Sequence, residues 1–125
     1  MALVDLDNFK ELNDTRGHAV GDTALKILAE VLRGHTRDSD TVARLGGDEF
    51  AILMPNTQST DSTALCEQLS AKVARQMGVA TFPLTVSIGC ATFQQTPATT
   101  GEVFEKADKA MYAAKAHGKA RVASL

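Results

Sequence analysis

The paired glycines Gly46 and Gly47 restrict the fold of this chain more than any other local feature. Strand-like runs lie on either side of them, at 41–45 and 50–54, and Pro55 follows the second run. Adjacent glycines accept the positive φ angles that a tight turn requires. The segment therefore predicts a β-hairpin with Gly46 and Gly47 at its turn.

The spacing of apolar residues predicts the other elements. We expect strands at 2–7, 84–93 and 120–123, with 79–82 hairpinned to the second, and helices at 8–14, 59–77 and 101–117, together with one that starts at Gly21 and Asp22 and ends at Gly34. The buried stripe of the last helix is expected to carry Val103, Phe104, Ala107 and Met111. This order predicts one domain over 1–125, an α/β sandwich with an antiparallel-rich central sheet flanked by helices.

Composition narrows the classes of function. The 125 residues suffice for one core, and 13 Lys and Arg against 15 Asp and Glu give a net charge of −2 and a pI near 5.9. No broad basic surface for nucleic acid or membrane is indicated, so phosphate recognition must be local. Cys66 and Cys90 lack the spacing of a zinc site or a disulfide framework. With no apolar run of membrane-spanning length and no signal peptide, we expect a cytoplasmic domain.

Four acids are expected to meet at one edge of the sheet. Asp5 and Asp7 end the first strand, and Asp48 and Glu49 lie in the hairpin turn. A single acid in such a place is usually a helix cap or a solvated turn residue. A cluster of carboxylates instead indicates a cation, and oxygen-only ligands suit Mg²⁺.

Two backbone features beside these acids suit a phosphate ligand. The helix that follows Asp7 would direct the N–H groups of Asn8, Phe9 and Lys10 at its start. Gly46 and Gly47 lack a Cβ and would let a ligand approach the backbone, although many hairpins use two glycines only to turn.

Three segments in this order resemble the GGDEF family of diguanylate cyclases. Residues 44–50 read Arg-Leu-Gly-Gly-Asp-Glu-Phe, which is similar to the family's signature motif. Residues 5–14, followed by Gly17-His18 and Gly21-Asp22, resemble its DxDxFKxxND…GH…GD segment. Residues 87–89 and 107–118 resemble its SIG and ADxAxYxAKxxG patterns. The resemblance covers nearly the whole chain.

The resemblance implies a fold akin to the adenylyl cyclase catalytic domain and the polymerase palm. The helix and DxLTGLxNRR segment that precede the family's first strand are absent, so the domain is expected to be N-terminally shortened. The family's activity would join two GTP into cyclic di-GMP and release two pyrophosphates, as an antiparallel homodimer with one half-site per chain. An upstream sensor or receiver domain would belong to the full-length protein.

The resemblance also implies roles for individual residues. Metal ligands would be Asp5, Asp48 and the Leu6 carbonyl, for Mg²⁺ or Mn²⁺, with Glu49 assisting deprotonation or acting as a supporting acid. Guanine would be read by Asn13 and Asp22, and the β- and γ-phosphates bound by Lys115 and Lys119. The family commonly has Arg at position 119, so this lysine lacks a bidentate fork. The structural alternative for both lysines is an exposed helix end.

A possible product site lies five residues before the hairpin turn. Arg37 and Asp40 match the family's RxxD inhibition site in type and spacing, and their side chains suit the two polar edges of guanine. A second arginine would fall near Ala64 or Gln68, and neither is basic. Arg75 or Arg33 could replace it.

Two classes of function remain open on the sequence. The first is the cyclase, which the intact Asp5, Asp48 and Glu49 favour. The second is a non-catalytic module that binds GTP or cyclic di-GMP.

Overall fold

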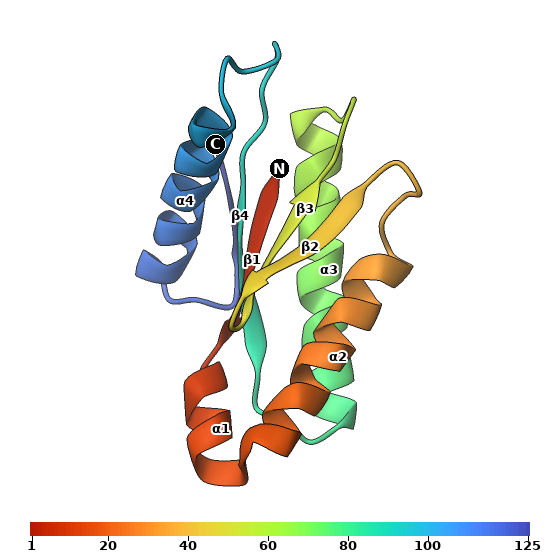
Figure 1. Cartoon of the computed structure of the whole chain (residues 1–125), viewed down its shortest axis with the longest axis vertical. Coiled ribbons are helices and arrows are strands. Elements are labelled where there is room, and N and C mark those ends of the chain that lie inside the picture. The colour runs from red at the N-terminus through yellow and green to blue at the C-terminus, as the bar shows by residue number, and fades with distance from the viewer.

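Strand β1 (Ala2–Asp7) forms the centre of a five-stranded sheet in the computed structural model, which describes residues 1–125 (Figure 1). The strand order is β2-β3-β1-β4-β5. β1 pairs antiparallel with both neighbours, β2 pairs antiparallel with β3, and only β5 runs parallel to its neighbour β4. The α/β sandwich with an antiparallel-rich sheet is confirmed.

The elements also follow the predicted order, apart from the strand expected at 79–82. They are α1 (Phe9–Arg16), α2 (His18–Gly34), β2 (Thr41–Gly46), β3 (Glu49–Leu53), α3 (Ser59–Val79), β4 (Thr85–Cys90), α4 (Thr100–Ala116) and β5 (Val122–Ser124). No helix is long and apolar enough to cross a membrane.

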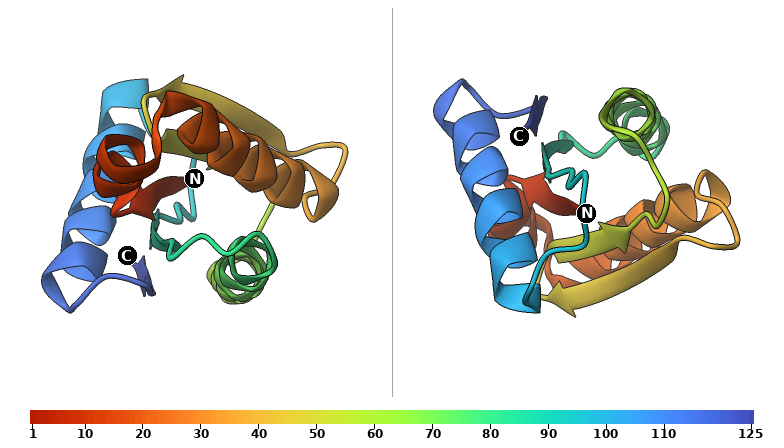
Figure 2. Two further views of the ribbon diagram at one scale, coloured as in Figure 1. Left: turned by 90° about the horizontal axis from the view of Figure 1, so that it is seen from below. Right: turned by 90° about the horizontal axis from the view of Figure 1, so that it is seen from above.

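Successive residues of β1 point to opposite faces of the sheet. Val4 and Leu6 belong to the larger core cluster, which α2 and α3 cover, while Leu3 packs with Ala107 and Met111 of α4. Seen along the sheet, α4 lies on one side and α2 and α3 on the other (Figure 2). Because side chains alternate, Asp5 and Asp7 share the α4 face with Leu3.

Gly89 lets α4 approach the sheet. A Cβ at this position would lie 2.2 Å from the Met111 backbone nitrogen and 2.7 Å from the Ala107 carbonyl oxygen. The helix backbone therefore occupies the space of the missing side chain. This contact explains the Ser-Ile-Gly segment physically, since Ile88 fills the opposite core and Ser87 bonds to Asp7.

Three predictions about the elements are wrong. The segment 79–82 is no strand: α3 continues to Val79, and Phe82 N–H donates to the Met77 carbonyl while Thr81, at φ 62, closes the helix. The second helix starts at His18 because Gly17, at φ 89, already ends the first. Phe104 of α4 is 39 % exposed, because the buried stripe of α4 consists of Ala107, Ala110, Met111 and Ala114.

Candidate active site

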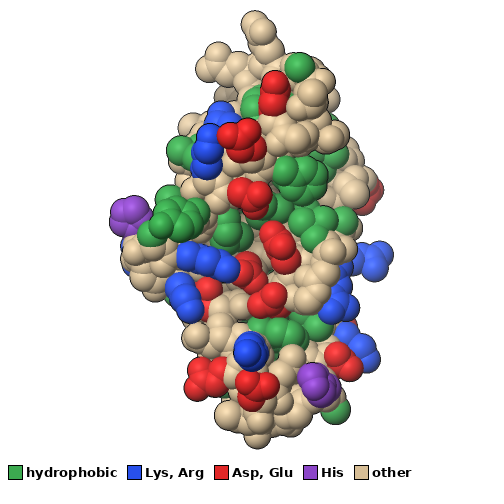
Figure 3. All heavy atoms as spheres, turned by 60° about the vertical axis from the view of Figure 1, so that its left-hand side comes forward, with side chains coloured by type: hydrophobic (Ala, Val, Ile, Leu, Met, Phe, Trp, Pro, Cys, Tyr) green, Lys and Arg blue, Asp and Glu red, His purple; other side chains and the backbone are tan.

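A groove of about 540 Å³ opens where β1 ends and α1 begins. It is lined by Asp5, Leu6, Asp7, Asn8, Phe9, Lys10, Glu11, Asp14, Asp48, Lys115 and Lys119. Eight of the residues predicted from the sequence to form the site line this groove: Asp5, Leu6, Asn8, Phe9, Lys10, Asp48, Lys115 and Lys119. Figure 3 shows acidic and basic side chains gathered together on this side of the molecule. The groove is the candidate site.

The sheet register brings the acids of β1 and the hairpin together. Asp5 lies directly opposite Glu49 in the β1–β3 pair, and the Leu6 N–H donates to the Asp48 carbonyl oxygen at 3.3 Å. Like charges opposite each other destabilise a sheet, so this arrangement calls for a cation. Burial and the nearby Asp5 carboxylate raise the pKa of Asp48 to about 6.

The ammonium group of Lys115 supplies a positive charge beside these carboxylates. Its Nζ reaches from the last turn of α4 to Oδ2 of Asp5. Burial opposes the charge of Lys115, but Asp5, with smaller contributions from Asp48 and Asp7, outweighs that effect and raises the pKa of the lysine. One ammonium group therefore pairs with Asp5 and is also attracted by the charges of Asp48 and Asp7.

The second carboxylate oxygen of Asp5, Oδ1, is suited to bind a metal ion. Asp5 Oδ1 is buried without a hydrogen-bond partner, one of only two such side-chain atoms in the protein. No three His, Cys, Asp or Glu side chains are arranged to hold a metal by themselves. Mg²⁺ commonly takes one or two carboxylates and completes its shell with water and phosphate oxygens, so Asp5 and Asp48 fit that metal.

Unlike Asp5, Asp7 accepts hydrogen bonds from the protein on both of its carboxylate oxygens. Its Oδ2 accepts from Thr85 Oγ1 at 2.8 Å and from the Ala120 N–H at 3.0 Å, and its Oδ1 accepts from Ser87 Oγ at 2.7 Å. It is only 3 % exposed. Of the two acids in Asp-x-Asp, only Asp5 has an oxygen free for a ligand. No local pattern indicates the roles of Thr85 and Ala120, whose contacts with Asp7 arise from the tertiary structure.

The hairpin turn is held by a residue to which the sequence assigned no role. Arg44 donates to the Gly47 carbonyl from Nε at 3.0 Å and from Nη2 at 2.8 Å. Gly46 and Gly47 have φ of 153 and 50, and a Cβ at either would meet no atom within 4 Å. Both glycines and Glu49 lie outside the groove lining. These two hydrogen bonds from Arg44 fix the turn that carries Asp48.

The start of α1 leaves its backbone donors without a side-chain cap. Asn8, at φ 63, is the N-cap residue and makes no capping bond. The N–H groups of the first turn, which include Phe9 and Lys10, therefore face the groove lined by these same residues. An anion at this position would complete the helix start.

Asn13 and Asp22, the expected guanine readers, do not line the groove. Asn13 packs against Gly21, where no Cβ would fit beside its amide, and Asp22 follows on the exposed side of α2. Asn13 Oδ1 is the second buried side-chain atom without a partner. Both unpartnered atoms of the protein thus belong to residues predicted to bind a ligand.

Arg37 and Asp40, which are predicted to bind product, bond to each other, so the Asp40 carboxylate does not present the free acceptor expected for guanine. Arg37 donates to Asp40 Oδ1 at 2.9 Å and also to the Pro55 carbonyl and to Thr57 Oγ1, and the Asp40 side chain is fully covered. Burial raises the pKa of Asp40, but hydrogen bonds from Arg37 outweigh it and lower the pKa. Arg37 remains about half exposed while Asp40 holds it in place.

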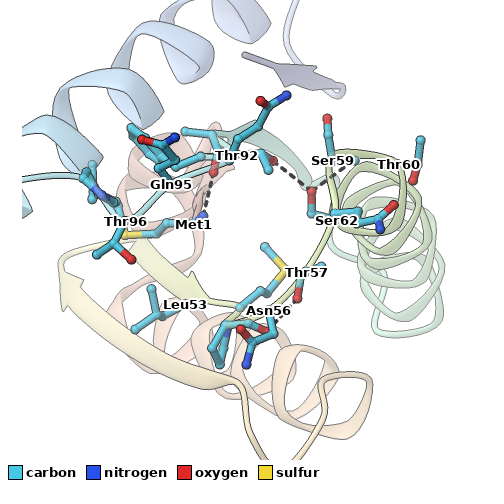
Figure 4. Close-up of a pocket in the computed structure, with 18 residues that line it drawn as sticks. Met1, Leu53, Asn56, Thr57, Ser59, Thr60, Ser62, Thr92, Gln95 and Thr96 are labelled. Carbon is cyan, nitrogen blue, oxygen red and sulfur yellow. Dashed lines mark hydrogen bonds between the residues drawn. The ribbon is translucent and has the colours of Figure 1, made fainter.

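A second cavity, of about 800 Å³, lies at the other end of the sheet (Figure 4). Uncharged side chains such as Thr57, Ser62, Thr92 and Gln95 line it, and Ser62 and Thr92 bond to each other at 3.2 Å. No Lys, Arg, Asp or Glu side chain lines this cavity. It lacks the charged groups that a polyphosphate and its metal require.

The sequence matches the family described as "Diguanylate cyclase, GGDEF domain" over residues 1–121. Diguanylate cyclase A of Treponema denticola is 35% identical over 123 residues, which are 96% of this chain and 33% of that protein. Diguanylate cyclase TpbB of Pseudomonas aeruginosa is 40% identical over 128 residues, 98% of this chain and 29% of the relative. The chain therefore spans about a third of the length of these curated relatives.

A solved structure with the same fold is the GGDEF domain of DgcB from Caulobacter crescentus, in complex with c-di-GMP. It is 33% identical, its TM-score is 0.85, and the match covers 98% of this chain and 75% of that one. The fold expected from the sequence motifs is confirmed.

Proposed function

This chain belongs to the diguanylate cyclase GGDEF domain family, and we propose that it condenses two GTP molecules into cyclic di-GMP and two pyrophosphates. The observation that carries the proposal is the unpartnered Asp5 Oδ1 beside Asp48, in a groove that also presents Lys115 and Lys119. Binding modules need no such paired carboxylates, so the intact pair favours the enzyme over the non-catalytic alternative.

The charge of the groove supports a metal-dependent site. Its acids Asp5, Asp7, Glu11, Asp14 and Asp48 outnumber the lysines Lys10, Lys115 and Lys119. A triphosphate would not enter this field without added cations. Asp5, Asp48 and the Leu6 carbonyl would hold Mg²⁺, for which Mn²⁺ can substitute. When bound, the metal would lower the pKa of the 3′-hydroxyl and neutralise charge on the α-phosphate.

The protein groups around this position would bind and orient the nucleotide. The first-turn N–H groups of α1 would hold phosphate oxygens, and Lys115 and Lys119 would bind the β- and γ-phosphates. In doing so Lys115 would leave Asp5. Glu49, opposite Asp5 on β3, would assist deprotonation by accepting the hydroxyl proton on its carboxylate.

Guanine recognition would lie between α1 and α2. Asn13 Oδ1 lacks a partner and can accept from a guanine N–H, and the Asp22 carboxylate can accept from N1–H and the 2-amino group. Adenine offers an acceptor at N1, so ATP would leave buried acceptors unpaired.

One chain supplies one half of the reaction centre. A single groove would bind one GTP, whereas the product contains two joined nucleotides. Two protomers would meet antiparallel, and each 3′-hydroxyl would attack the α-phosphate held by the partner. The relatives are about three times longer than this chain, so a sensor or receiver domain in the full-length protein would bring two domains together.

Product feedback would act at Arg37. Cyclic di-GMP is bound in the solved DgcB structure, and Arg37 is half exposed and held by Asp40. β2 has six residues and joins this loop to the hairpin turn, a separation of about 17 Å at the usual rise of a strand. Product at Arg37 would hold two domains in an arrangement that keeps their grooves apart.

The test is to incubate the purified chain with GTP and Mg²⁺ over a series of protein concentrations. The proposal predicts cyclic di-GMP as the product and a rate per protomer that rises with protein concentration, because two protomers share each turnover. Tight GTP binding with no product at any concentration, including with a dimerising fusion partner, would instead identify a binding module.

A further inference from the structure

The chain leaves α4 through a turn of unusual backbone conformation. Gly118, Lys119 and Ala120 have φ of 108, 61 and 49. The left-handed region disfavours residues with a Cβ, and neither Lys nor Ala belongs to the small group, such as Asn, that enters it readily. Two such residues in succession persist only where surrounding contacts hold them.

Two of these contacts involve a charged group. The Lys119 N–H donates to the Ala114 carbonyl at 3.2 Å, and Arg121 Nε donates to the Lys119 carbonyl at 3.1 Å. Between them, the Ala120 N–H donates to Asp7 Oδ2 at 3.0 Å. A hydrogen bond in which one group is ionised is stronger than one between neutral groups. Arg121 belongs to the turn itself, so Asp7 is the charged group that ties the turn to the central strand.

Asp7 is itself fixed. It is 3 % exposed at the end of the central strand, where the hydroxyl groups of Thr85 and Ser87 bond to its two oxygens. Both donors come from β4 and therefore belong to the same rigid sheet. The carboxylate thus transmits the position of the sheet to the turn.

Lys119 depends on the turn for its own position. The side chain lines the groove but makes no hydrogen bond or ion pair with the protein, in contrast to Lys115, which pairs with Asp5. Only the backbone conformation therefore directs Lys119 toward the groove. Without the bond to Asp7, Lys119 would keep its positive charge, but its ammonium group would no longer be held at the groove.

We propose that Asp7 is a positioning residue, whose carboxylate holds the 118–121 turn through the Ala120 N–H and so presents Lys119 to the terminal phosphates of the nucleotide. The inference rests on the proposed function, which places those phosphates at Lys119. The two acids of Asp-x-Asp have separate tasks: Asp5 faces the ligand and Asp7 orients a residue that binds it.

The test measures binding of 3′-deoxy-GTP, which lacks the attacking hydroxyl and cannot react, and of GMP, which lacks the terminal phosphates. Asp7→Asn keeps the shape of the side chain but removes its charge and one acceptor. We expect it to weaken 3′-deoxy-GTP binding about tenfold and to leave GMP binding within about twofold, since one charge-assisted contact is lost. Hydrogen exchange at the Ala120 amide should accelerate in the same variant.

A double-mutant cycle separates positioning from general stability. In a Lys119→Met background, Asp7→Asn should cause no further loss of 3′-deoxy-GTP affinity, because both changes remove the same contact. Ser62→Ala, which deletes a buried hydrogen bond at the far end of the sheet, is the matched control and should leave affinity unchanged. If Asp7→Asn does not fold, Thr85→Val loosens the same oxygen and should give a smaller loss of the same kind.

Additive losses in the cycle, or equal weakening of GMP and 3′-deoxy-GTP, would overturn the positioning role and leave the proposed function standing. Failure of the wild-type chain to bind 3′-deoxy-GTP with Mg²⁺ would overturn the proposed function and this inference with it. Loss confined to 3′-deoxy-GTP and absent in the Lys119→Met background is the result that supports it.

Discussion

Lys115 on α4 and Asp5 on β1 form an ion pair although 110 positions separate them in the sequence. The pair places an ammonium group beside the carboxylates proposed to hold Mg²⁺, and it leaves Asp5 Oδ1 buried without a partner. A metal at Asp5 would therefore compete with the lysine. Phosphates would relieve the competition by drawing Lys115 away, so metal and nucleotide should bind cooperatively.

Replacing Lys115 tests this competition. Lys115→Met should strengthen Mn²⁺ binding without nucleotide by several-fold, because the internal cation is removed, and weaken 3′-deoxy-GTP binding about tenfold, because a charge-assisted phosphate contact is lost. Lys115→Arg, which keeps the charge, is the control. Electron paramagnetic resonance of free Mn²⁺ and calorimetry give the two affinities. Unchanged Mn²⁺ affinity in Lys115→Met would show that the lysine does not compete.

Asp48 should lower the stability of the fold at neutral pH. Its pKa is raised to about 6, so the folded chain holds this proton more tightly than the unfolded chain does. The cost of ionised Asp48 is then absent below pH 4, grows between pH 4 and pH 6, and is complete above pH 6.

Asp48→Asn should therefore stabilise the metal-free chain at pH 8 by about 1 kcal/mol, a figure reduced for partial exposure. The gain should disappear at pH 4, as measured by urea denaturation of both proteins at each pH. Catalysis should be lost in the variant, because a proposed metal ligand is removed. A variant less stable than wild type at pH 8 would contradict the raised pKa.

Gly89 should tolerate no side chain. In Gly89→Ala the new Cβ would overlap the Met111 backbone, which cannot rotate away, so we expect a loss of about 3 kcal/mol or failure to fold. Gly78→Ala in α3 is the control, since no atom lies within 4 Å of its Cβ position, and it should stabilise by about 0.5 to 1 kcal/mol. Urea denaturation measures both. If Gly89→Ala were as stable as wild type, the close approach of α4 to the sheet would not depend on a glycine at this position.

Much of the fold could be predicted from local pattern because each element carries its own signal. The paired glycines predicted the hairpin, and the alternation in 2–7 predicted the strand that brings Asp5 to Glu49. The errors arose where backbone conformation or tertiary packing decides. Thr81 adopts a left-handed conformation that turns the expected strand at 79–82 into a helix end, and no local pattern announces that.

The candidate site, like the fold, could be predicted only in part from local sequence pattern. Asp5 and Asp48 could be found from their motifs, but the different tasks of Asp5 and Asp7 could not, because both are aspartates on the same face of one strand. The difference comes from Thr85 on β4 and Ala120 beyond α4, which are 78 and 113 positions from Asp7. Only the assembled structure brings these donors to one oxygen.

Arg37 should determine sensitivity to product. Arg37→Ala removes the exposed guanidinium and leaves Asp40 without its partner, so added cyclic di-GMP should inhibit at least tenfold less strongly. Initial rates of pyrophosphate release at fixed GTP, with increasing cyclic di-GMP, give the comparison. Arg75→Ala in α3 tests whether that arginine completes the site. Equal inhibition of wild type and Arg37→Ala would place the product elsewhere, for example in the GTP groove.

The most direct test of the central claim is the formation of cyclic di-GMP by the chain fused to a dimeric coiled coil, with GTP and Mg²⁺, compared with the same fusion carrying Asp5→Asn. The asparagine keeps the size of the side chain and removes the charge that the metal requires. The proposed function predicts cyclic di-GMP and pyrophosphate in a molar ratio of one to two from the first fusion and neither from the second. Equal product from both fusions, or bound GTP without product in the first, would contradict it.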